Sequence, residues 1–335
     1  MLNKAKIRQL IFGKRSISDK RWQQRLPGIY VFNYHRIGDA RSSDFDPNVF
    51  SCTAEQFEQH LLFYKQQFDV LNEAQLLSLL DSQQAITKPY ALITFDDGYI
   101  DSYQQAFPLL KKHGLSAMFF VVTEYTNGGS LAWWDEVAWL VKHSKVSQLK
   151  LEHWANAVDL SGKNEKQNIR KMLFAFKADQ QYTMEQKLVQ LRAICKAPAL
   201  QNSLSLFANW QQLQEMAASG MTIGSHTRSH PILAHLEPDQ QREELDESRR
   251  YIENQLNSSV CMLAYPVGST DSFTEVTQML AKETGYRLAF SFMNGINKQL
   301  DEQSAYSLKR ISVDGNKSVD SLKVQIMELN SKLGN

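Results

Sequence analysis

The order of short apolar runs and helix-period segments along the chain is the feature that most constrains its fold. The runs are rich in β-branched and aromatic residues, as strands are. We expect strands at residues 29–34, 90–95, 117–122, 221–224, 262–265, 288–292 and 307–311, and helices at residues 53–68, 101–113, 210–219, 238–255 and 273–283. Strands that alternate with helices form βαβ units around a parallel sheet, and seven such units are enough to close, or nearly close, a barrel.

Residues 125–207 interrupt this alternation. They contain no clear strand, but they are rich in Gln and Lys, have helical patterns and carry Trp133-Trp134-Asp135. We therefore expect a mostly helical insertion above the barrel, in a place where loops shape substrate clefts. The alternative is that Trp133, Trp134 and Trp139 form the insertion's own core.

The N-terminal segment, residues 1–25, is strongly basic. It holds eight Lys and Arg residues against the single acid Asp19, so it is either a solvated tail or a surface that contacts anionic lipid, where each basic residue adds roughly 1 kcal/mol. Its short apolar run is broken at Gly13 and no cleavage site follows, so we expect no secretory signal and a cytoplasmic protein, peripheral to the inner membrane. The barrel domain is expected at residues 26–315 and a C-terminal helix at residues 316–335.

The composition excludes several classes of protein. The formal net charge of +1 gives no field for nucleic acid, and no stretch approaches the roughly 20 apolar residues of a membrane-spanning helix. The three cysteines, Cys52, Cys195 and Cys261, have neither a disulfide framework nor metal-site spacing, and we interpret them as packing residues in a reducing compartment.

Two adjacent carboxylates follow one of the expected strands. The strand at residues 90–95 runs directly into Asp96-Asp97-Gly98. Asp-Gly after a strand is also an ordinary turn signal. Two neighbouring carboxylates at a strand end, however, repel each other unless a positive charge lies nearby. A metal ion would supply that charge, with one Asp as a ligand and the other as a base.

A histidine pair follows another expected strand. His226 and His230 lie four residues apart in the run SHTRSHP and can converge on one metal if the segment is helical or tightly turned. Two surface histidines are the alternative, because chance pairs at this spacing are common. Together with one of the two aspartates, the pair matches the open three-ligand arrangement of a catalytic metal site, which leaves room for water and a substrate oxygen.

These motifs carry a resemblance to a known family. TFDDG at residues 94–98, SHTRSH at 225–230 and YPVG at 265–268 resemble the motifs of the polysaccharide deacetylase family with its NodB homology domain, a group similar to carbohydrate esterase family 4. The resemblance covers about residues 26–315, and the insertion is its least typical part. It implies an irregular (β/α)7 barrel and the hydrolysis of N-acetyl groups on amino sugars.

The same resemblance implies roles for individual residues. Asp96 would be the general base. Asp97, His226 and His230 would bind a divalent metal, commonly Zn²⁺, with Ni²⁺, Co²⁺ and Mn²⁺ as alternatives.

The third motif departs from the family pattern. The segment Tyr265-Pro266-Val267 would contact the substrate, and the backbone N–H of Val267 would stabilise the oxyanion. The usual Arg two residues before the proline is Ala264 here. Arg310, in the last expected strand, is our candidate to replace that Arg in steadying the base.

The family's usual C-terminal Leu-x-His general acid is also absent, because the last strand reads SLKRI. The run Tyr34-His35-Arg36 at the end of the first expected strand resembles the signature of the family branch that acts on exported or envelope polysaccharides. In that branch the general-acid His comes from the N-terminal strand. We therefore predict that His35 protonates the leaving amine; a packed or surface histidine is the alternative.

The leading hypothesis is a hydrolase of non-peptide carbon–nitrogen bonds that removes N-acetyl groups from a surface glycan or from its lipid- or nucleotide-linked precursor. One alternative is a hydrolase of a small amide or formamide on the same barrel. Another is a catalytically silent glycan-binding module, against which the intact set of base and ligands argues. Substrate length separates the first two, because a polymer needs an open groove whereas a small amide needs a closed pocket.

Overall fold

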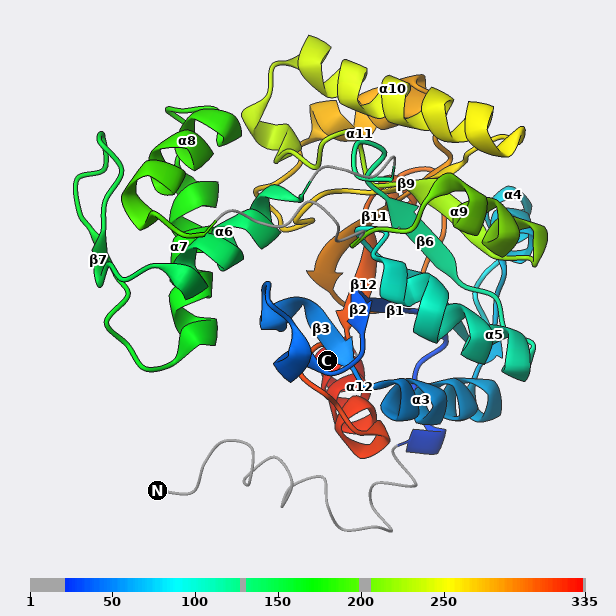
Figure 1. Cartoon of the computed structure of the whole chain (residues 1–335). Helices are drawn as coiled ribbons and strands as arrows, with labels where there is room; N and C mark the ends of the chain where they lie inside the picture. The colour runs from blue at the N-terminus through cyan, green and yellow to red at the C-terminus, as the bar shows by residue number, and fades with distance from the viewer. Residues whose placement is uncertain (1–21, 127–130, 199–205, 334–335) are drawn as a thin grey trace.

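The computed structural model describes residues 22–126, 131–198 and 206–333 of the chain. Seven parallel strands follow one another in the order β1-β12-β11-β10-β9-β6-β5, and β5 pairs with β1 to close a barrel (Figure 1). They are β1 (Gly28–Tyr34), β5 (Pro89–Phe95), β6 (Met118–Val121), β9 (Thr222–Ser225), β10 (Met262–Ala264), β11 (Leu288–Asn294) and β12 (Leu308–Ser312). The expected irregular (β/α)7 barrel is confirmed, and each expected strand lies within two residues of its expected bounds.

Helices surround the barrel, as Figure 1 shows. The five expected helices correspond to α3 (Ala54–Gln67), the π-helix η3 (Ser102–Ala106) with α5 (Phe107–His113), α9 (Trp210–Ala218), α10 (Pro238–Leu256) and α11 (Glu275–Glu283), and α12 (Val319–Leu333) follows the barrel. Thr53 and Gln56 form a reciprocal capping box at the start of α3. The sequence did not predict β4 (Asp69–Val70), which pairs with β5, or α4 (Glu73–Ser82).

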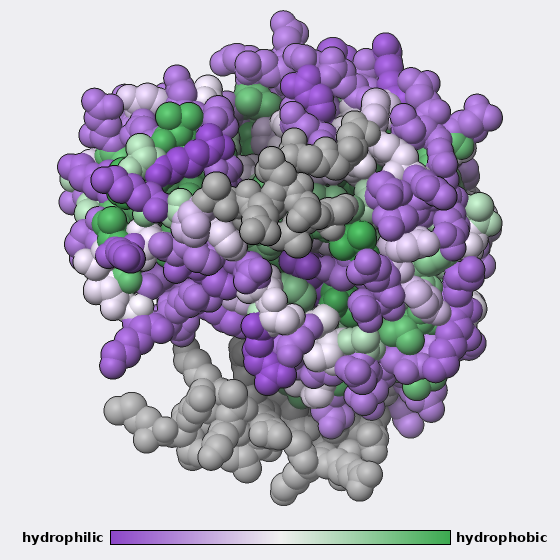
Figure 2. Space-filling model, in the orientation of Figure 1, coloured by the Kyte–Doolittle hydropathy of each residue, from purple (hydrophilic) through white to green (hydrophobic). Residues whose placement is uncertain are grey.

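Alternate residues of the strands separate two apolar layers. In β1, Ile29 and Val31 belong to a buried cluster made largely of strand residues, whereas Phe32 faces the helices and stacks on Tyr64 of α3 at 4.1 Å. The side that holds Ile29 and Val31 becomes polar at the carboxyl end of the strand, where Asn33 lies fully buried. On the face of the molecule drawn in Figure 2, hydrophilic residues predominate. The polar side chains at the carboxyl ends of the strands therefore lie at one end of an apolar barrel interior.

The insertion forms a lobe beside the barrel (Figure 1). It contains α6 (Trp133–His143), α7 (Glu165–Ala178) and α8 (Met184–Cys195), and a short antiparallel pair, β7 (Gln148–Leu149) and β8 (Val158–Asp159), that the sequence did not predict. Its apolar cluster includes Trp133 and Trp134. Both side chains also line the pocket described below. The two tryptophans therefore belong to the apolar core of the insertion and also contribute to the pocket wall.

The described part of the basic N-terminal segment packs against the barrel. Residues 1–21 lie outside the described residues. Trp22 is 7% exposed and packs against Phe63 and Phe68, and Arg25 donates a hydrogen bond to the backbone O of Trp22 at 3.1 Å. In the described ranges, no helix has both the length and the apolar character needed to cross a membrane.

Candidate active site

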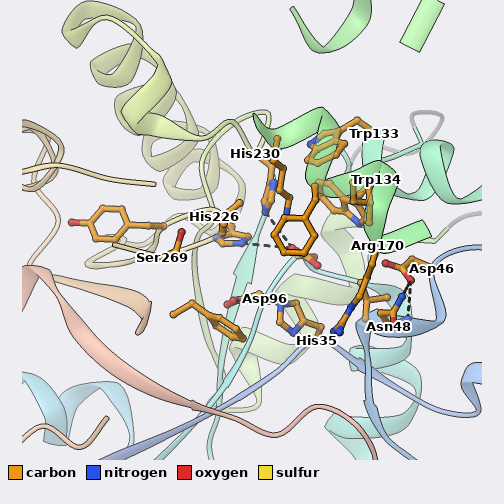
Figure 3. A pocket seen from close by; sticks show the side chains of 18 residues that line it. His35, Asp46, Asn48, Asp96, Trp133, Trp134, Arg170, His226, His230 and Ser269 are labelled. Carbon is orange, nitrogen blue, oxygen red and sulfur yellow. Dashed lines mark hydrogen bonds and ion pairs between the residues drawn. The ribbon is translucent and has the colours of Figure 1, made fainter. Parts of the chain in front are cut away.

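The carboxyl ends of the parallel strands meet at one edge of the barrel, and the expected site residues lie at that edge. Figure 3 labels His35, Asp96, His226 and His230 among them. His35 follows β1, Asp96 and Asp97 follow β5, His226 and His230 follow β9, Val267 follows β10, and Arg310 lies in β12. All of them except Arg310 line a pocket of about 550 Å³. In barrels of this kind, the loops at this edge carry the active site.

The loops that bear these residues have an uncommon backbone conformation. Asp97, Thr227, His230 and Val267 have φ values of 73°, 67°, 61° and 63°. This left-handed region costs residues other than glycine of order 1–3 kcal/mol each, and it persists only where the surroundings enforce it. At His230 the enforcing contact is a hydrogen bond from its N–H to Thr227 Oγ1 at 3.1 Å. Strain of this kind gathers at functional sites.

Asp97, His226 and His230 form a buried group whose ligand atoms all lie within 4.8 Å of one another. Asp97 Oδ1 lies 3.6 Å from Nε2 of each histidine (Figure 3). Two ligands that are each about 2.0–2.1 Å from a tetrahedral zinc ion lie roughly 3.4 Å apart, so the spacing fits a single ion. Burial raises the pKa of Asp97, and a carboxylate in such a place needs a cation to stay ionised.

The two histidines keep an Nε2 available for a ligand bond. His226 Nδ1 donates to the backbone O of Ala264 at 2.7 Å, which fixes the tautomer with a free Nε2. His230 Nδ1 has no hydrogen-bond partner among the described residues, and its ring lies beside Trp134 with centroids 4.4 Å apart. Burial lowers the pKa of His230 well below its usual value, and the neutral ring is the form that binds metal.

A glutamate from α10 holds the loop between the two histidines. Glu244 is 5% exposed. Its Oε2 accepts hydrogen bonds from the N–H groups of Arg228 and Ser229, both at 2.9 Å, and its Oε1 accepts one from Ser229 Oγ at 2.7 Å. The sequence did not reveal this role, because nothing in the helical pattern of α10 indicates which of its acids turns inward.

Asp96 is held on both of its oxygens. Arg310, which is 1% exposed, donates from Nη1 to Oδ1 at 2.7 Å and from Nη2 to Oδ2 at 2.8 Å, and Asn33 Nδ2 donates to Oδ2 at 3.1 Å. Burial acts to raise the pKa of Asp96, but Arg310, His226 and His35 hold it well below its usual range. The expected contact between Arg310 and Asp96 is present, and it favours the ionised form of this carboxylate.

His35 lies between two carboxylates. Its Nε2 is 3.9 Å from Asp96 Oδ2, and its Nδ1 is 3.7 Å from Asp314 Oδ1. Burial acts to lower the pKa of His35, but Asp314, Asp97 and Asp96 together raise it to about 9. These carboxylates therefore favour the protonated ring, which is the form that can donate. Asp314 follows β12 and belongs to no motif, which is why the sequence did not single it out.

The segment Tyr265-Pro266-Val267 follows β10, and its residues differ in their contacts. The Tyr265 hydroxyl donates to the backbone O of Tyr306 at 3.0 Å, and its ring stacks on Phe273 at 4.3 Å. Tyr265 and Val267 both contribute to the pocket wall, whereas Pro266 does not. The Tyr265 hydroxyl therefore donates its hydrogen bond within the fold rather than into the pocket.

Another wall of the pocket comes from outside the barrel strands. It is made by residues of α6 and α7 and of the turn at η2 (Pro47–Val49): Asp46, Asn48, Val49, Trp133, Trp134, Arg170, Leu173, Phe174 and Lys177. Apart from the tryptophans, the sequence predicted none of these positions, because a helical pattern in an insertion does not show which face meets the barrel.

The fold and these motifs agree with one known family. The family model for polysaccharide deacetylases matches residues 83–289, which is more than half of the chain. The chain therefore belongs to the polysaccharide deacetylase family.

Individual relatives are distant. The chain is 23% identical over 284 residues to the Bacillus subtilis (strain 168) protein named "Putative polysaccharide deacetylase YxkH", a match that covers 84% of this chain and 70% of YxkH. Among solved structures, the Streptococcus pyogenes deacetylase PplD in complex with acetate matches with a TM-score of 0.58 and 21% identity, over 90% of this chain and 99% of PplD. A de-N-acetylase from Aggregatibacter actinomycetemcomitans matches with a TM-score of 0.56 and 17% identity, over 89% and 99% of the two chains. At these identities the structural likeness establishes a shared fold.

Proposed function

We propose that this chain is a metal-dependent hydrolase that removes N-acetyl groups from the amino sugars of a surface polysaccharide or of its precursor. The observation that carries the proposal is the group Asp97, His226 and His230 in one pocket with Asp96 and His35, where His35 Nε2 lies 3.9 Å from Asp96 Oδ2. Hydrolysis of an acetamide needs a polarising group, a base and an acid, and this set supplies all three.

The proposed roles follow from the contacts. A divalent metal held by Asp97, His226 and His230, with Zn²⁺ as our first choice and Ni²⁺, Co²⁺ or Mn²⁺ as alternatives, would polarise the carbonyl and lower the pKa of water toward about 7. Asp96 accepts a proton from the attacking water. His35 gives its proton to the leaving nitrogen as the carbon–nitrogen bond breaks, so that acetate and a free amino sugar are released.

Two further residues complete the proposal. Arg310 orients Asp96 through its two hydrogen bonds, and the backbone N–H of Val267 stabilises the oxyanion. The environments of the acid and the base support their assignments, because the pKa of Asp96 is held low and that of His35 is raised. Titrating groups whose pKa values are pushed apart are the pattern of an acid–base pair.

A hydrolase of a small amide is the second candidate. It is favoured by the limited volume of the pocket, about 550 Å³ with one wall from α6 and α7, because a small amide needs no long groove. A sugar residue at the end of a chain, or on a precursor, also fits such a pocket.

We further propose a cytoplasmic protein at the inner membrane face, supported by the basic charge of residues 1–25.

Removal of the metal is expected to abolish acetate release. Dialysis against dipicolinate should remove the ion held by Asp97, His226 and His230, and addition of Zn²⁺ should restore the rate. The measurement is acetate release from N-acetylated oligosaccharides, nucleotide sugars and simple amides, with the metal content determined by elemental analysis. Undiminished activity in protein shown to be metal-free would rule the proposal out, and turnover of simple amides alone would favour the second candidate.

Replacement of His35 by alanine is expected to remove the basic limb of the pH–rate profile. An acid must be protonated to act, so the rate of the unaltered protein should fall as the pH rises through the pKa of His35, which neighbouring carboxylates raise to about 9. A bound divalent cation repels the protonated ring, so the limb should lie at or below that pH. The control is His113→Ala, which alters a histidine at the end of α5 that pairs with Glu58 of α3. An unchanged bell-shaped profile in His35→Ala would assign the acid to another group.

A further inference from the structure

The wall of the pocket supplied by α7 carries two basic side chains. Arg170, Phe174 and Lys177 are spaced at i, i+4 and i+7, which places them on one face of the helix, and all three line the pocket. Figure 3 draws the Arg170 side chain directed into the pocket. The roles proposed above for acetamide hydrolysis use none of these side chains. We call Arg170 and Lys177 the α7 cations.

The α7 cations have no fixed anionic partner. Within residues 22–126, 131–198 and 206–333, neither Arg170 nor Lys177 makes a hydrogen bond or an ion pair; Lys177 Nζ lies 6.0 Å from the centroid of the Trp133 ring. Burial lowers the pKa of Lys177, and the charges of Asp97 and Asp46 oppose that shift from beyond ion-pair distance. Two other basic residues of the insertion, Lys171 and Arg192, are held in place by hydrogen bonds. Lys171 donates to a backbone oxygen at 2.7 Å, and Arg192 binds two glutamates. A purely structural role for the α7 cations would predict similar contacts.

None of the acids that line the pocket forms an ion pair with these cations. Asp96 is bonded to Arg310, and Asp97 belongs to the proposed metal group. Asp46 accepts hydrogen bonds from Asn48 N at 2.8 Å and from Asn48 Nδ2 at 2.7 Å. The α7 cations oppose the rise that burial causes in the pKa of Asp46, yet neither comes within ion-pair distance of it. With a divalent metal bound, the pocket would therefore hold an excess of positive charge.

We propose that the α7 cations bind phosphoryl groups, so that the substrate is an N-acetylated amino sugar carrying a glycosyl diphosphate. This inference rests on the proposed function and names its substrate class. Arg170 offers a fork of donors that matches phosphate oxygens, and Lys177 offers a point charge. Seven residues of helix separate their backbones by about 10 Å along the axis, a distance that two long side chains can close from either side of a diphosphate. Nucleotide-linked and lipid-linked sugars share this chemistry.

Phe174 supports the same inference. It lies between the α7 cations in sequence and is 73% exposed. An exposed aromatic ring on a pocket wall gains apolar burial when a sugar ring or a base covers it. A neutral polymer could also cover this ring, but it would leave the α7 cations without a partner. The α7 cations therefore favour a sugar diphosphate over a neutral polymer as the substrate.

The test is ligand binding measured without turnover. Metal-loaded Asp96→Asn protein is titrated by calorimetry with uridine diphosphate N-acetylglucosamine, with N-acetylglucosaminyl diphosphate on a farnesyl chain, and with neutral chitotriose. We expect at least one diphosphate to bind about tenfold or more tightly than chitotriose. Arg170→Ala and Lys177→Ala should each weaken diphosphate binding by about tenfold, as the loss of a hydrogen bond to a charged group does, and should leave chitotriose binding unchanged.

The control is Lys163→Ala. Lys163 is exposed, lies just before α7 and does not line the pocket, so its removal deletes the same charge without affecting the ligand. Equal affinity for diphosphate and neutral ligands, or diphosphate binding unchanged in both α7 variants, overturns the inference. The tighter of the two diphosphates identifies a nucleotide or a lipid as the carrier.

Acetate release by the unaltered protein separates this inference from the proposed function. Release from chitotriose alone would leave deacetylation standing and overturn the diphosphate inference. Selective diphosphate binding that depends on the α7 cations, without acetate release from any of the three compounds, would retain the anion site and overturn the deacetylase assignment.

Discussion

Asp96→Asn is expected to lower kcat by about 10²–10⁴-fold, the usual contribution of a general base, while the protein keeps its metal. An amide cannot accept the proton of the attacking water. The ligand group Asp97, His226 and His230 is untouched by the change, and the nearest contacts of Asp96 are Arg310 and Asn33 rather than the ligands. Acetate release at saturating substrate measures the loss, and elemental analysis measures the retained metal.

The same substitution has a structural cost that must be measured separately. The asparagine Nδ2 would face a donor from Arg310 or Asn33, and the buried guanidinium would lose its carboxylate. Breaking a buried ion pair by removing one partner typically costs about 3–5 kcal/mol. Thermal unfolding should therefore show a lower midpoint, and turnover should be compared well below it.

Asp135→Asn is the matched control for this prediction. Asp135 is fully buried in α6 and accepts a hydrogen bond from the Tyr99 hydroxyl at 2.8 Å, but it does not line the pocket. Burial raises its pKa to about 7, so a neutral amide replaces a group that is already protonated about half of the time near neutral pH. We expect turnover close to that of the unaltered protein. An equal loss in both variants, or full turnover in Asp96→Asn, would remove Asp96 from the role of base.

The barrel and the ligand group could be predicted because both depend on local patterns. Apolar runs of β-branched and aromatic residues predicted the strands, and parallel strands end at one edge of a barrel. Asp97 and His226 lie more than a hundred residues apart in the sequence, yet each directly follows a strand. Their meeting at 3.6 Å follows from the topology. A motif that directly follows a strand of a parallel barrel therefore predicts where its side chains lie in the folded protein.

The supporting contacts could not be predicted, because they join elements whose relative placement has no local pattern. Glu244 is one of several acids on α10, and only the path of the preceding loop selects it. Asp314 reaches His35 from a turn at the other end of the chain. Arg170 and Lys177 look like solvated residues on an ordinary amphipathic helix, and they become part of the site only because the insertion packs with that face toward the barrel.

His230→Ala is expected to weaken metal binding by more than the 10–100-fold that the loss of an outer-shell partner causes, and to lower activity with it. Only Asp97 and His226 would remain as ligands, and two ligands do not make the three-ligand site of a catalytic metal. A metal that binds only the folded state stabilises it by about 2.7 kcal/mol when its concentration is 100 times the dissociation constant. The unaltered protein should therefore gain thermal stability with added Zn²⁺, and the variant should gain much less.

The rise in the thermal unfolding midpoint on addition of Zn²⁺ is a better readout than the midpoint itself. His230→Ala also leaves a space beside Trp134, and that space lowers stability whether or not metal is present. His235→Ala is the matched control: His235 ends the 3-10 turn η4 (Leu233–His235) that follows the loop, is exposed, and its ring nitrogen Nε2 bonds Gln180 at 3.0 Å. It should keep the full metal content and the full Zn²⁺-dependent rise. If His230→Ala kept both as well, the metal would have to bind elsewhere, and the three-ligand group would lose its proposed role.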